Sequence, residues 1–201
     1  MARTGGAGGD RLRGDDAANT LTGNDDIDIG VYFGNRSDFT IDSDGAGNFT
    51  VARNASADVD TLLGIEHIEF RDFNVAMDLQ GNAGQVARIL GAVFAPAAVA
   101  NKEYAGIGLD LLDVGMPYEA LAALALQVAL GPNATNEQVV TLLYTNIAGV
   151  GPGSGELELY AGMLESGDFT RGGLGVFAAD LDLTAARIGL DALAQTGLAY
   201  L

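Results

Sequence analysis

Acidic side chains recur beside glycines at a fixed spacing over the first 30 residues of the chain. Three consecutive nine-residue units cover residues 5–13, 14–22 and 23–31. Each unit begins with glycine and has Asp10, Asn19 or Asp28 at its sixth position. Glycine allows a tight turn, the acidic or amide group lies beside that turn, and one apolar residue per unit points inward. The period of nine therefore predicts a coil of short parallel strands.

This repeat resembles the RTX (repeats-in-toxin, hemolysin-type calcium-binding) nonapeptide G-G-x-G-x-D-x-U-x, where U is apolar. The first unit matches it at Gly5, Gly6, Gly8, Asp10 and Leu12. The second unit keeps Gly14, Asn19 and Leu21, and the third keeps Gly23 and Asp28 but has Gly30 at the apolar position.

In the RTX family, calcium lies between successive turns, so the resemblance implies one or two calcium sites. The implied ligands are oxygens of Gly6, Gly8, Asp10, Asp15, Asp16, Asn19, Asp25 and Asp28. Ligation by oxygen alone suits a hard cation with six to eight donors and disfavours zinc and copper. The alternative is a flexible Gly/Asp-rich leader that binds nothing, since few repeats provide few stacking partners.

Residues 28 to 79 are predicted to be β structure. Residues 38–42 and 49–53 alternate in polarity around an Asp/Gly-rich turn, which predicts a hairpin with Phe39, Ile41, Phe49 and Val51 inward. Inward residues are then expected at Leu62, Ile65, Ile68 and Phe70.

This stretch is similar to segments that follow RTX repeats, which read V-x-F-S-G-x-R-x-D-Y-x-I and then D-G-x-D-x-L-x-N-I-E-x-L-x-F-x-D. The matching residues are Val31, Phe33, Gly34, Arg36, Asp38, Phe39, Ile41, Asp60, Leu62, Ile65, Glu66, Ile68, Phe70 and Asp72. The resemblance implies a cap over the open end of the coil. For Arg36 and Glu66 we favour structural ion pairing over calcium ligation, and for His67 a polar role in a strand over metal binding.

A second region begins where residues 80–84 interrupt both patterns, so the predicted domains are 1–80 and 81–201. The second region contains an internal duplication offset by about 52 to 53 residues. Apolar spacing predicts about six helices, near residues 83–94, 97–114, 117–130, 135–148, 154–166 and 170–179, with a last one at 183–198.

The duplicated region is similar to a helical domain of unknown function common in exported bacterial proteins, with the pattern F-V-x-x-L-Y-x-x-x-L-G-R-x-P-D-x-x-G-x-x-Y-W-x-x-x-L-x-x-G. Its matches are Val139, Leu142, Leu143, Tyr144, Ile147, Gly149, Leu159, Tyr160, Leu164 and Gly167. Related helical domains in surface-layer proteins can anchor to surface polysaccharide. The Ala/Leu-rich segment 120–130 is expected in the core, with a subunit interface as the alternative.

Composition narrows the function classes. The chain of 201 residues has a formal net charge of −17 and no cysteine. Such a charge repels nucleic acid and anionic lipid and attracts divalent cations. No apolar window is long enough to span a bilayer, and no cleavable signal is recognised. Because the chain opens inside a repeat, we expect a fragment of a longer protein.

The predicted fold class is α+β: a short parallel β-roll with a hairpin cap, followed by a bundle of about six helices. No nucleophile motif, phosphate loop or metal-binding helix pair occurs, so we expect no enzymatic activity. The predicted function is that of a calcium-binding C-terminal module of a type I-exported RTX-type protein, secreted or on the bacterial cell surface, with an apolar, base-poor tail as export signal. The alternative is an adhesive or surface-layer module whose helical half binds surface carbohydrate. The oligomeric state is left open.

Overall fold

The chain is an α+β protein. The computed structural model describes residues 1–201 and contains two mixed five-stranded sheets and eight α-helices. The chain forms two compact units, one built from Met1–Ala83 with Ala192–Leu201 and the other from Gly84–Asp191. No helix is both long and apolar enough to cross a lipid bilayer.

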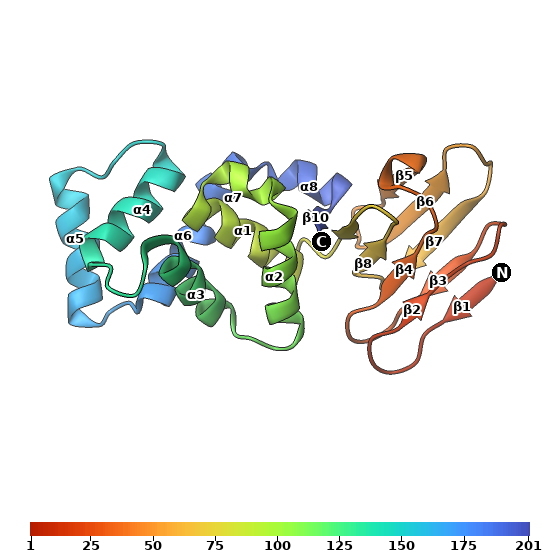
Figure 1. Cartoon of the computed structure of the whole chain (residues 1–201), viewed down its shortest axis with the longest axis horizontal. Coiled ribbons are helices and arrows are strands. Elements are labelled where there is room, and N and C mark those ends of the chain that lie inside the picture. The colour runs from red at the N-terminus through yellow and green to blue at the C-terminus, as the bar shows by residue number, and fades with distance from the viewer. The chain divides into compact units, whose positions relative to one another are not determined.

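The first unit, called the strand unit below, holds all the strands (Figure 1). They are β1 (Ala2–Thr4), β2 (Arg11–Leu12), β3 (Thr20–Thr22), β4 (Ile29–Val31), β5 (Phe39–Ser43), β6 (Phe49–Arg53), β7 (Val59–Leu63), β8 (His67–Glu69), β9 (Asn74–Ala76) and β10 (Leu198–Tyr200), with a 3-10 turn η1 (Arg36–Asp38) before β5. One sheet has the order β1-β3-β7-β6-β5, and the other has the order β10-β9-β8-β4-β2.

The first four strands alternate between the two sheets. In one sheet β1 pairs with β3 and β3 with β7, all parallel, and in the other β2 pairs with β4 and β4 with β8, also parallel. Each short strand therefore adds one rung to its sheet. Leu21 and Leu62 are directly paired on β3 and β7, and both are fully buried. The apolar position of the nine-residue repeat therefore supplies the core between the sheets.

The predicted hairpin is confirmed: β5 and β6 pair antiparallel, and β6 continues antiparallel onto β7. Phe39, Ile41, Phe49 and Val51 are all buried, as the alternation predicted. The core below them also includes the expected inward residues Leu62, Ile65, Ile68 and Phe70. Burying such a side chain stabilises the fold by roughly 1.5–3 kcal/mol before conformational entropy is subtracted.

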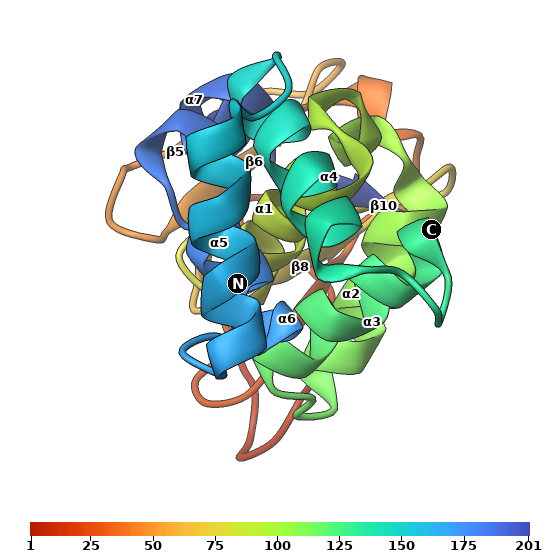
Figure 2. The same cartoon turned by 90° about the vertical axis from the view of Figure 1, so that its left-hand side faces the viewer.

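The second unit, called the helical unit below, holds α1 to α7. The helices of the chain are α1 (Asn82–Phe94), α2 (Lys102–Asp113), α3 (Tyr118–Leu130), α4 (Asn136–Ala148), α5 (Ser154–Ser166), α6 (Arg171–Ala179), α7 (Asp182–Ile188) and α8 (Leu190–Thr196), with a 3-10 helix η2 (Pro96–Ala100). Figures 1 and 2 show α4 and α5 side by side. Thr135 caps α4 by accepting a hydrogen bond from Gln138 N, and Gly149 ends it in the left-handed conformation.

The structure has eight α-helices instead of the seven predicted segments because the last segment is divided in two, while another segment is divided into a 3-10 helix and one α-helix. The segment expected at 97–114 is divided at Asn101, whose side chain caps α2 by accepting from Tyr104 N at 3.1 Å. The segment expected at 183–198 is divided at Gly189, which has φ of +67° and ends α7. Amide capping and glycine both favour a helix end over helix continuation.

The domain range 81–201 needs a correction at the end of the chain. Residues 192–201 belong to the strand unit, where β10 pairs antiparallel with β9. Leu198 and Tyr200 are buried there, and the Tyr200 hydroxyl lies 2.9 Å from His67 Nδ1. Residues 198–200 of the apolar end, for which the sequence predicts an export signal, form an edge strand of a sheet.

The two helical repeats contact each other through equivalent helices. α3 and α6 occupy the same place in their repeats and pack closely. A Cβ on Gly175 would lie 3.2 Å from Ala122 Cβ, and one on Gly172 would lie 2.5 Å from the Glu119 carbonyl oxygen. Ala122 and Glu119 each lie about 53 positions before the glycine that they contact. Each glycine therefore contacts the equivalent position of the earlier repeat. Contacts between equivalent positions indicate a local two-fold relation between the repeats.

Candidate functional site

The glycine-led turns of the strand unit stack on one another. Backbone hydrogen bonds join them: Gly5 N donates to Thr22 O at 2.8 Å, and Gly23 N donates to Leu63 O at 2.9 Å. The turns before β2, β4 and β8 thus form one row, called the first turn row. The turns before β3 and β7 form the opposite turn row.

Side chains at the sixth position of each unit bridge adjacent turns. Asp10 N donates to Asp28 Oδ1 at 2.8 Å, and Asp28 N donates to Glu66 Oε2 at 2.9 Å. In the opposite turn row, Asn19 N donates to Asp60 Oδ1 at 2.8 Å. The acidic and amide positions of the repeat therefore form two ladders, one along each turn row.

Asp28 is the most unusual group of the first ladder. Its side chain is fully buried, and its Oδ2 accepts no hydrogen bond. Burial raises the pKa of this carboxyl group, and the neighbouring charges of Asp10 and Asp26 raise it further. A buried carboxylate with one oxygen left without a donor is costly when ionised, so Asp28 Oδ2 leaves an unmet requirement for a cation or a proton.

A backbone carbonyl oxygen lies on the same side of Gly23 as Asp28 Oδ2. A Cβ on Gly23 would collide both with Asp28 Oδ2 and with the carbonyl oxygen of Gly64. The two oxygens thus lie against the bare α-carbon of Gly23, where no side chain fits. We call this pair of oxygens the Gly23 cradle; oxygen donors of this kind, one of them from a carboxylate, are those that a hard cation takes.

The preceding turn is better satisfied by hydrogen bonds. Asp10 Oδ2 accepts from Gly6 N at 2.6 Å. Asn24 Nδ2 donates to Gly5 O at 3.0 Å and to Gly6 O at 3.5 Å. These oxygens already have donors, so the cradle beside Gly23 is the stronger candidate.

In the opposite turn row an amide donates to carbonyl oxygens of its own turn, although the amide oxygen, Asn19 Oδ1, is itself buried and accepts no hydrogen bond. Asn19 Nδ2 donates to Asp15 O at 3.2 Å and to Ala17 O. Asp15 accepts from Ala17 N, and this hydrogen bond lowers the pKa of the exposed Asp15 carboxyl. The Asn19 amide therefore donates to carbonyl oxygens of its own turn, whereas the carboxylate of Asp28 cannot donate.

The eight implied ligands are thus divided between two places. Gly6, Gly8, Asp10, Asp25 and Asp28 lie in the first turn row, whereas Asp15, Asp16 and Asn19 lie in the opposite turn row. Asp25 is exposed. No group of three or more acidic, histidine or cysteine side chains could hold one metal ion together. A cation at Asp28 would consequently depend on backbone carbonyl oxygens for much of its coordination.

Two members of the ladders were not predicted as such. Asp60 and Glu66 follow the inserted hairpin, which interrupts the period of nine, so the sequence alone places them in the cap. The available signal is the tripeptide Asp60-Thr61-Leu62, which repeats the spacing of Asp10 and Leu12. Tyr32 also bonds to this ladder, donating its hydroxyl to Asp60 Oδ2 at 3.1 Å.

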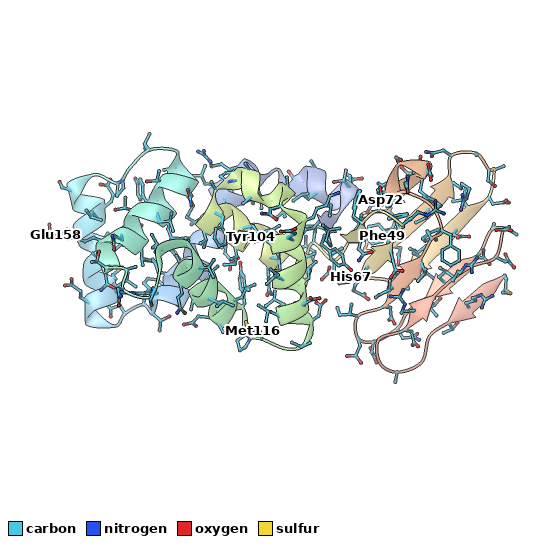
Figure 3. The ribbon with its side chains drawn as sticks, in the orientation of Figure 1. Phe49, His67, Asp72, Tyr104, Met116 and Glu158 are labelled. Atoms are coloured by element: carbon cyan, nitrogen blue, oxygen red, sulfur yellow. The ribbon has the colours of Figure 1, made fainter.

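The other polar candidates have structural roles. Arg36 lies in the first turn of the hairpin insertion and donates from Nη1 to Phe39 O at 2.7 Å, while its backbone N donates to Asp72 Oδ1 at 2.8 Å. Burial lowers the pKa of Arg36, and Asp72 opposes this. His67 is buried beside Tyr200, and Figure 3 labels its place on β8.

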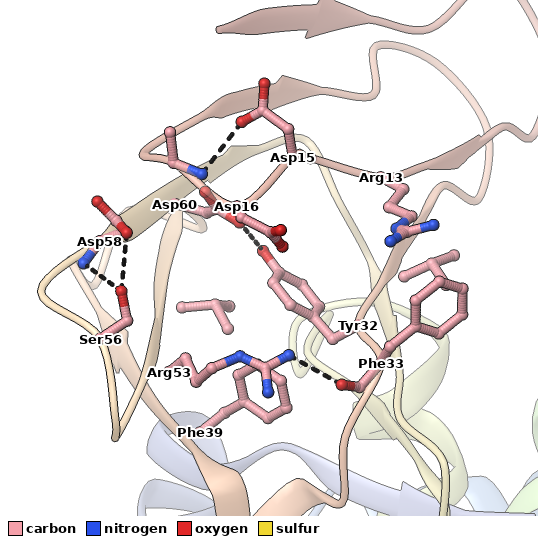
Figure 4. A pocket seen from close by; sticks show the side chains of 14 residues that line it. Arg13, Asp15, Asp16, Tyr32, Phe33, Phe39, Arg53, Ser56, Asp58 and Asp60 are labelled. Carbon is pink, nitrogen blue, oxygen red and sulfur yellow. Dashed lines mark hydrogen bonds between the residues drawn. The ribbon is translucent and has the colours of Figure 1, made fainter.

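A pocket of about 440 Å³ opens at the opposite turn row. Figure 4 shows Asp15, Asp16, Arg13 and Arg53 around it. The guanidinium carbon of Arg13 lies 3.9 Å from the centre of the Phe33 ring, and Arg53 donates to the Phe33 carbonyl oxygen at 2.8 Å. These arginines therefore hold the loops of the hairpin insertion together.

No protein-family model matches the chain, and no curated protein is significantly similar to it. The resemblance to RTX repeats therefore rests on the residues named above.

Proposed function

We propose that this chain is a non-catalytic, calcium-binding module of an RTX-type protein that is exported by a type I pathway and folds on calcium outside the cell. The observation that carries the proposal is the buried Asp28 carboxylate, whose free oxygen lies with the Gly64 carbonyl oxygen against Gly23. Calcium takes such oxygen ligands at 2.3–2.6 Å in flexible geometry. Asp28, Gly64 and the carbonyl groups of the turn would hold the ion.

The arrangement of strands supports the same proposal. Parallel neighbours β1, β3 and β7 in one sheet and β2, β4 and β8 in the other are the pairings that a parallel β-roll requires. The β5–β6 hairpin is inserted between β4 and β7 and packs Phe39 and Phe49 onto the end of that coil. We interpret the hairpin as its cap.

Calcium would then act as a folding switch. The strand unit brings Asp10, Asp26 and Asp28 together, and their mutual repulsion opposes folding while calcium is scarce. At the calcium concentrations outside a cell, binding to the folded state alone adds its binding free energy to folding. A chain that stays open inside the cell and closes outside suits export.

Calcium titration into chelator-treated protein tests this function. Far-ultraviolet circular dichroism and the melting temperature are followed from micromolar to millimolar calcium, with magnesium as the control cation. We expect strand signal and melting temperature to rise with calcium and to respond weakly to magnesium, which keeps its water shell and demands octahedral geometry. Unchanged spectra and an unchanged melting temperature would contradict the proposal.

A further inference from the structure

The helical unit carries two apolar clefts at equivalent places of its two repeats. The first cleft, of about 110 Å³, lies among α1, α2 and α3, and its lining exposes no polar surface. The second, of about 180 Å³, lies among α4, α5 and α6 and reaches α7. Figure 3 shows Tyr104 on α2, at the edge of the first cleft.

The two clefts are built from the same positions. Three pairs of lining residues, each about 53 positions apart, illustrate this: Val86 and Val140, Gly108 and Tyr160, and Leu124 and Phe177. The contact between α3 and α6 already relates the repeats by a local two-fold. The duplication has therefore preserved a cleft as well as a helical fold.

Large apolar side chains stand exposed at both clefts. Ile107 is 58% and Val128 is 61% exposed at the first cleft, and Phe177 is 42% and Leu183 is 50% exposed at the second. Single exposed apolar residues are ordinary, but groups of them around a cleft mark an interaction surface. Each cleft has the size of one or two side chains, which is far below the volume that a whole small-molecule ligand fills.

Charge around the clefts selects the partner. Exposed Glu103 and Asp110 lie one turn before and one turn after Ile107 on α2. At the second cleft, exposed Asp180 and Asp182 alternate with the exposed Leu181. A second copy of this chain or an anionic membrane would bring like charge against these rims, since the chain carries −17.

We infer that each cleft binds one apolar anchor of a cationic amphipathic helix from a partner protein, with lysine or arginine facing the acidic rim. Such a helix presents large apolar side chains at i, i+3 and i+4 and basic residues beside them. The helical unit offers two equivalent sites of this kind. This inference is independent of the proposed calcium site, because all its residues lie in Gly84–Asp191.

Isothermal titration calorimetry with a synthetic Leu/Lys amphipathic helix tests the inference, and a Leu/Glu helix of the same length is the control peptide. We expect two Leu/Lys peptides to bind per full-length chain, binding that weakens with salt, and no binding of the Leu/Glu peptide. Ile107→Glu should reduce the stoichiometry to one, as should Phe177→Glu. Val114→Glu, which changes an 83% exposed residue that lines neither cleft, should leave two sites.

Circular dichroism of every variant establishes that it is folded before binding is measured. Ile107→Ser, which removes the apolar anchor without adding charge, should weaken binding at the first cleft by about tenfold. Absence of Leu/Lys binding, equal binding of the Leu/Glu peptide, or an unchanged stoichiometry in folded Ile107→Glu and Phe177→Glu would overturn the inference. So would sedimentation that shows self-association abolished by these variants, since the clefts would then be covered by a second copy.

Discussion

Replacing Asp28 by asparagine should have opposite effects with and without calcium. Asp28 is fully buried, and its Oδ2 has no donor. An amide nitrogen at that position can donate towards the Gly64 carbonyl oxygen, much as Asn19 Nδ2 donates to the carbonyl of Asp15 in the opposite turn row. Leaving a buried polar group unsatisfied costs about 1–3 kcal/mol, so Asp28→Asn should stabilise the calcium-free strand unit by about that amount.

In calcium, the wild-type protein should be more stable than Asp28→Asn. At a calcium concentration about 100-fold above its Kd, binding adds about 2.7 kcal/mol to the folded wild-type protein. Asp28→Asn removes the buried charge and should lose most of this gain. For a unit of fewer than 100 residues, such as the strand unit, about 1 kcal/mol corresponds to roughly 4–8 °C in melting temperature. Both effects are therefore measurable by differential scanning calorimetry in chelator and in calcium.

The pH dependence provides a second readout. Burial raises the pKa of Asp28 above its ordinary 3.8, so without calcium the folded state binds this proton more tightly than the unfolded chain does. Its contribution to stability is therefore present at acid pH and is lost as the pH rises above that ordinary value. Asp28→Asn should flatten this slope.

Asp42→Asn is the matched control, because it removes the same charge from an exposed position of β5. It should leave the calcium response unchanged. The reasoning would be refuted if Asp28→Asn destabilised the chelated protein, or if calcium raised its melting temperature as much as that of the wild type.

Further predictions concern packing in both units. Gly23→Ala should destabilise the strand unit by about 2 kcal/mol or more and abolish its calcium response, as measured by calorimetry, because the new methyl group would collide with Asp28 Oδ2 and the Gly64 carbonyl oxygen and displace them. Tyr200→Phe should cost about 1–2 kcal/mol by removing the hydroxyl that hydrogen-bonds buried His67, and faster amide hydrogen exchange in β9 and β10 would reveal it. Gly172→Ala should destabilise the helical unit because its Cβ would meet the α3 backbone, whereas Gly162→Ala, in open space on α5, should be neutral or stabilising by up to about 1 kcal/mol. Equal melting temperatures for these two glycine variants would contradict the described contact between the repeats.

Local pattern predicted most of the secondary structure. Alternation around the turn at residues 44–48 predicted the β5–β6 hairpin, and its inward residues are buried. Apolar spacing and helix-ending glycines predicted α3 to α6 within a few residues. These signals succeed because they act between residues that are close in the chain.

Long-range pairing could not be predicted in the same way. β10 has three residues and pairs with β9, which lies more than a hundred positions earlier. Its alternation of Leu198 and Tyr200 around Ala199 is too short to distinguish an edge strand from an apolar tail. The partner of His67 was missed for the same reason.

At the candidate site, the sequence identified the residue types but not their environments. Asp25 and Asp28 are chemically identical and three positions apart, yet one is exposed and the other fully buried. The sixth position of the repeat sets Asp28 apart from Asp25, but its burial depends on the stacking of the turn at Gly64 on the turn at Gly23, which crosses the inserted hairpin. Insertion of the hairpin likewise hid the repeat positions of Asp60 and Glu66.

Crystals of the full chain grown in millimolar calcium give the most direct test of the central claim, because anomalous diffraction locates the ion. The account predicts a peak 2.3–2.6 Å from Asp28 Oδ2 and from the Gly64 carbonyl oxygen, and loss of this peak in Asp28→Asn crystals. An ordered strand unit with Asp28 buried and no ion beside Gly23 would contradict it.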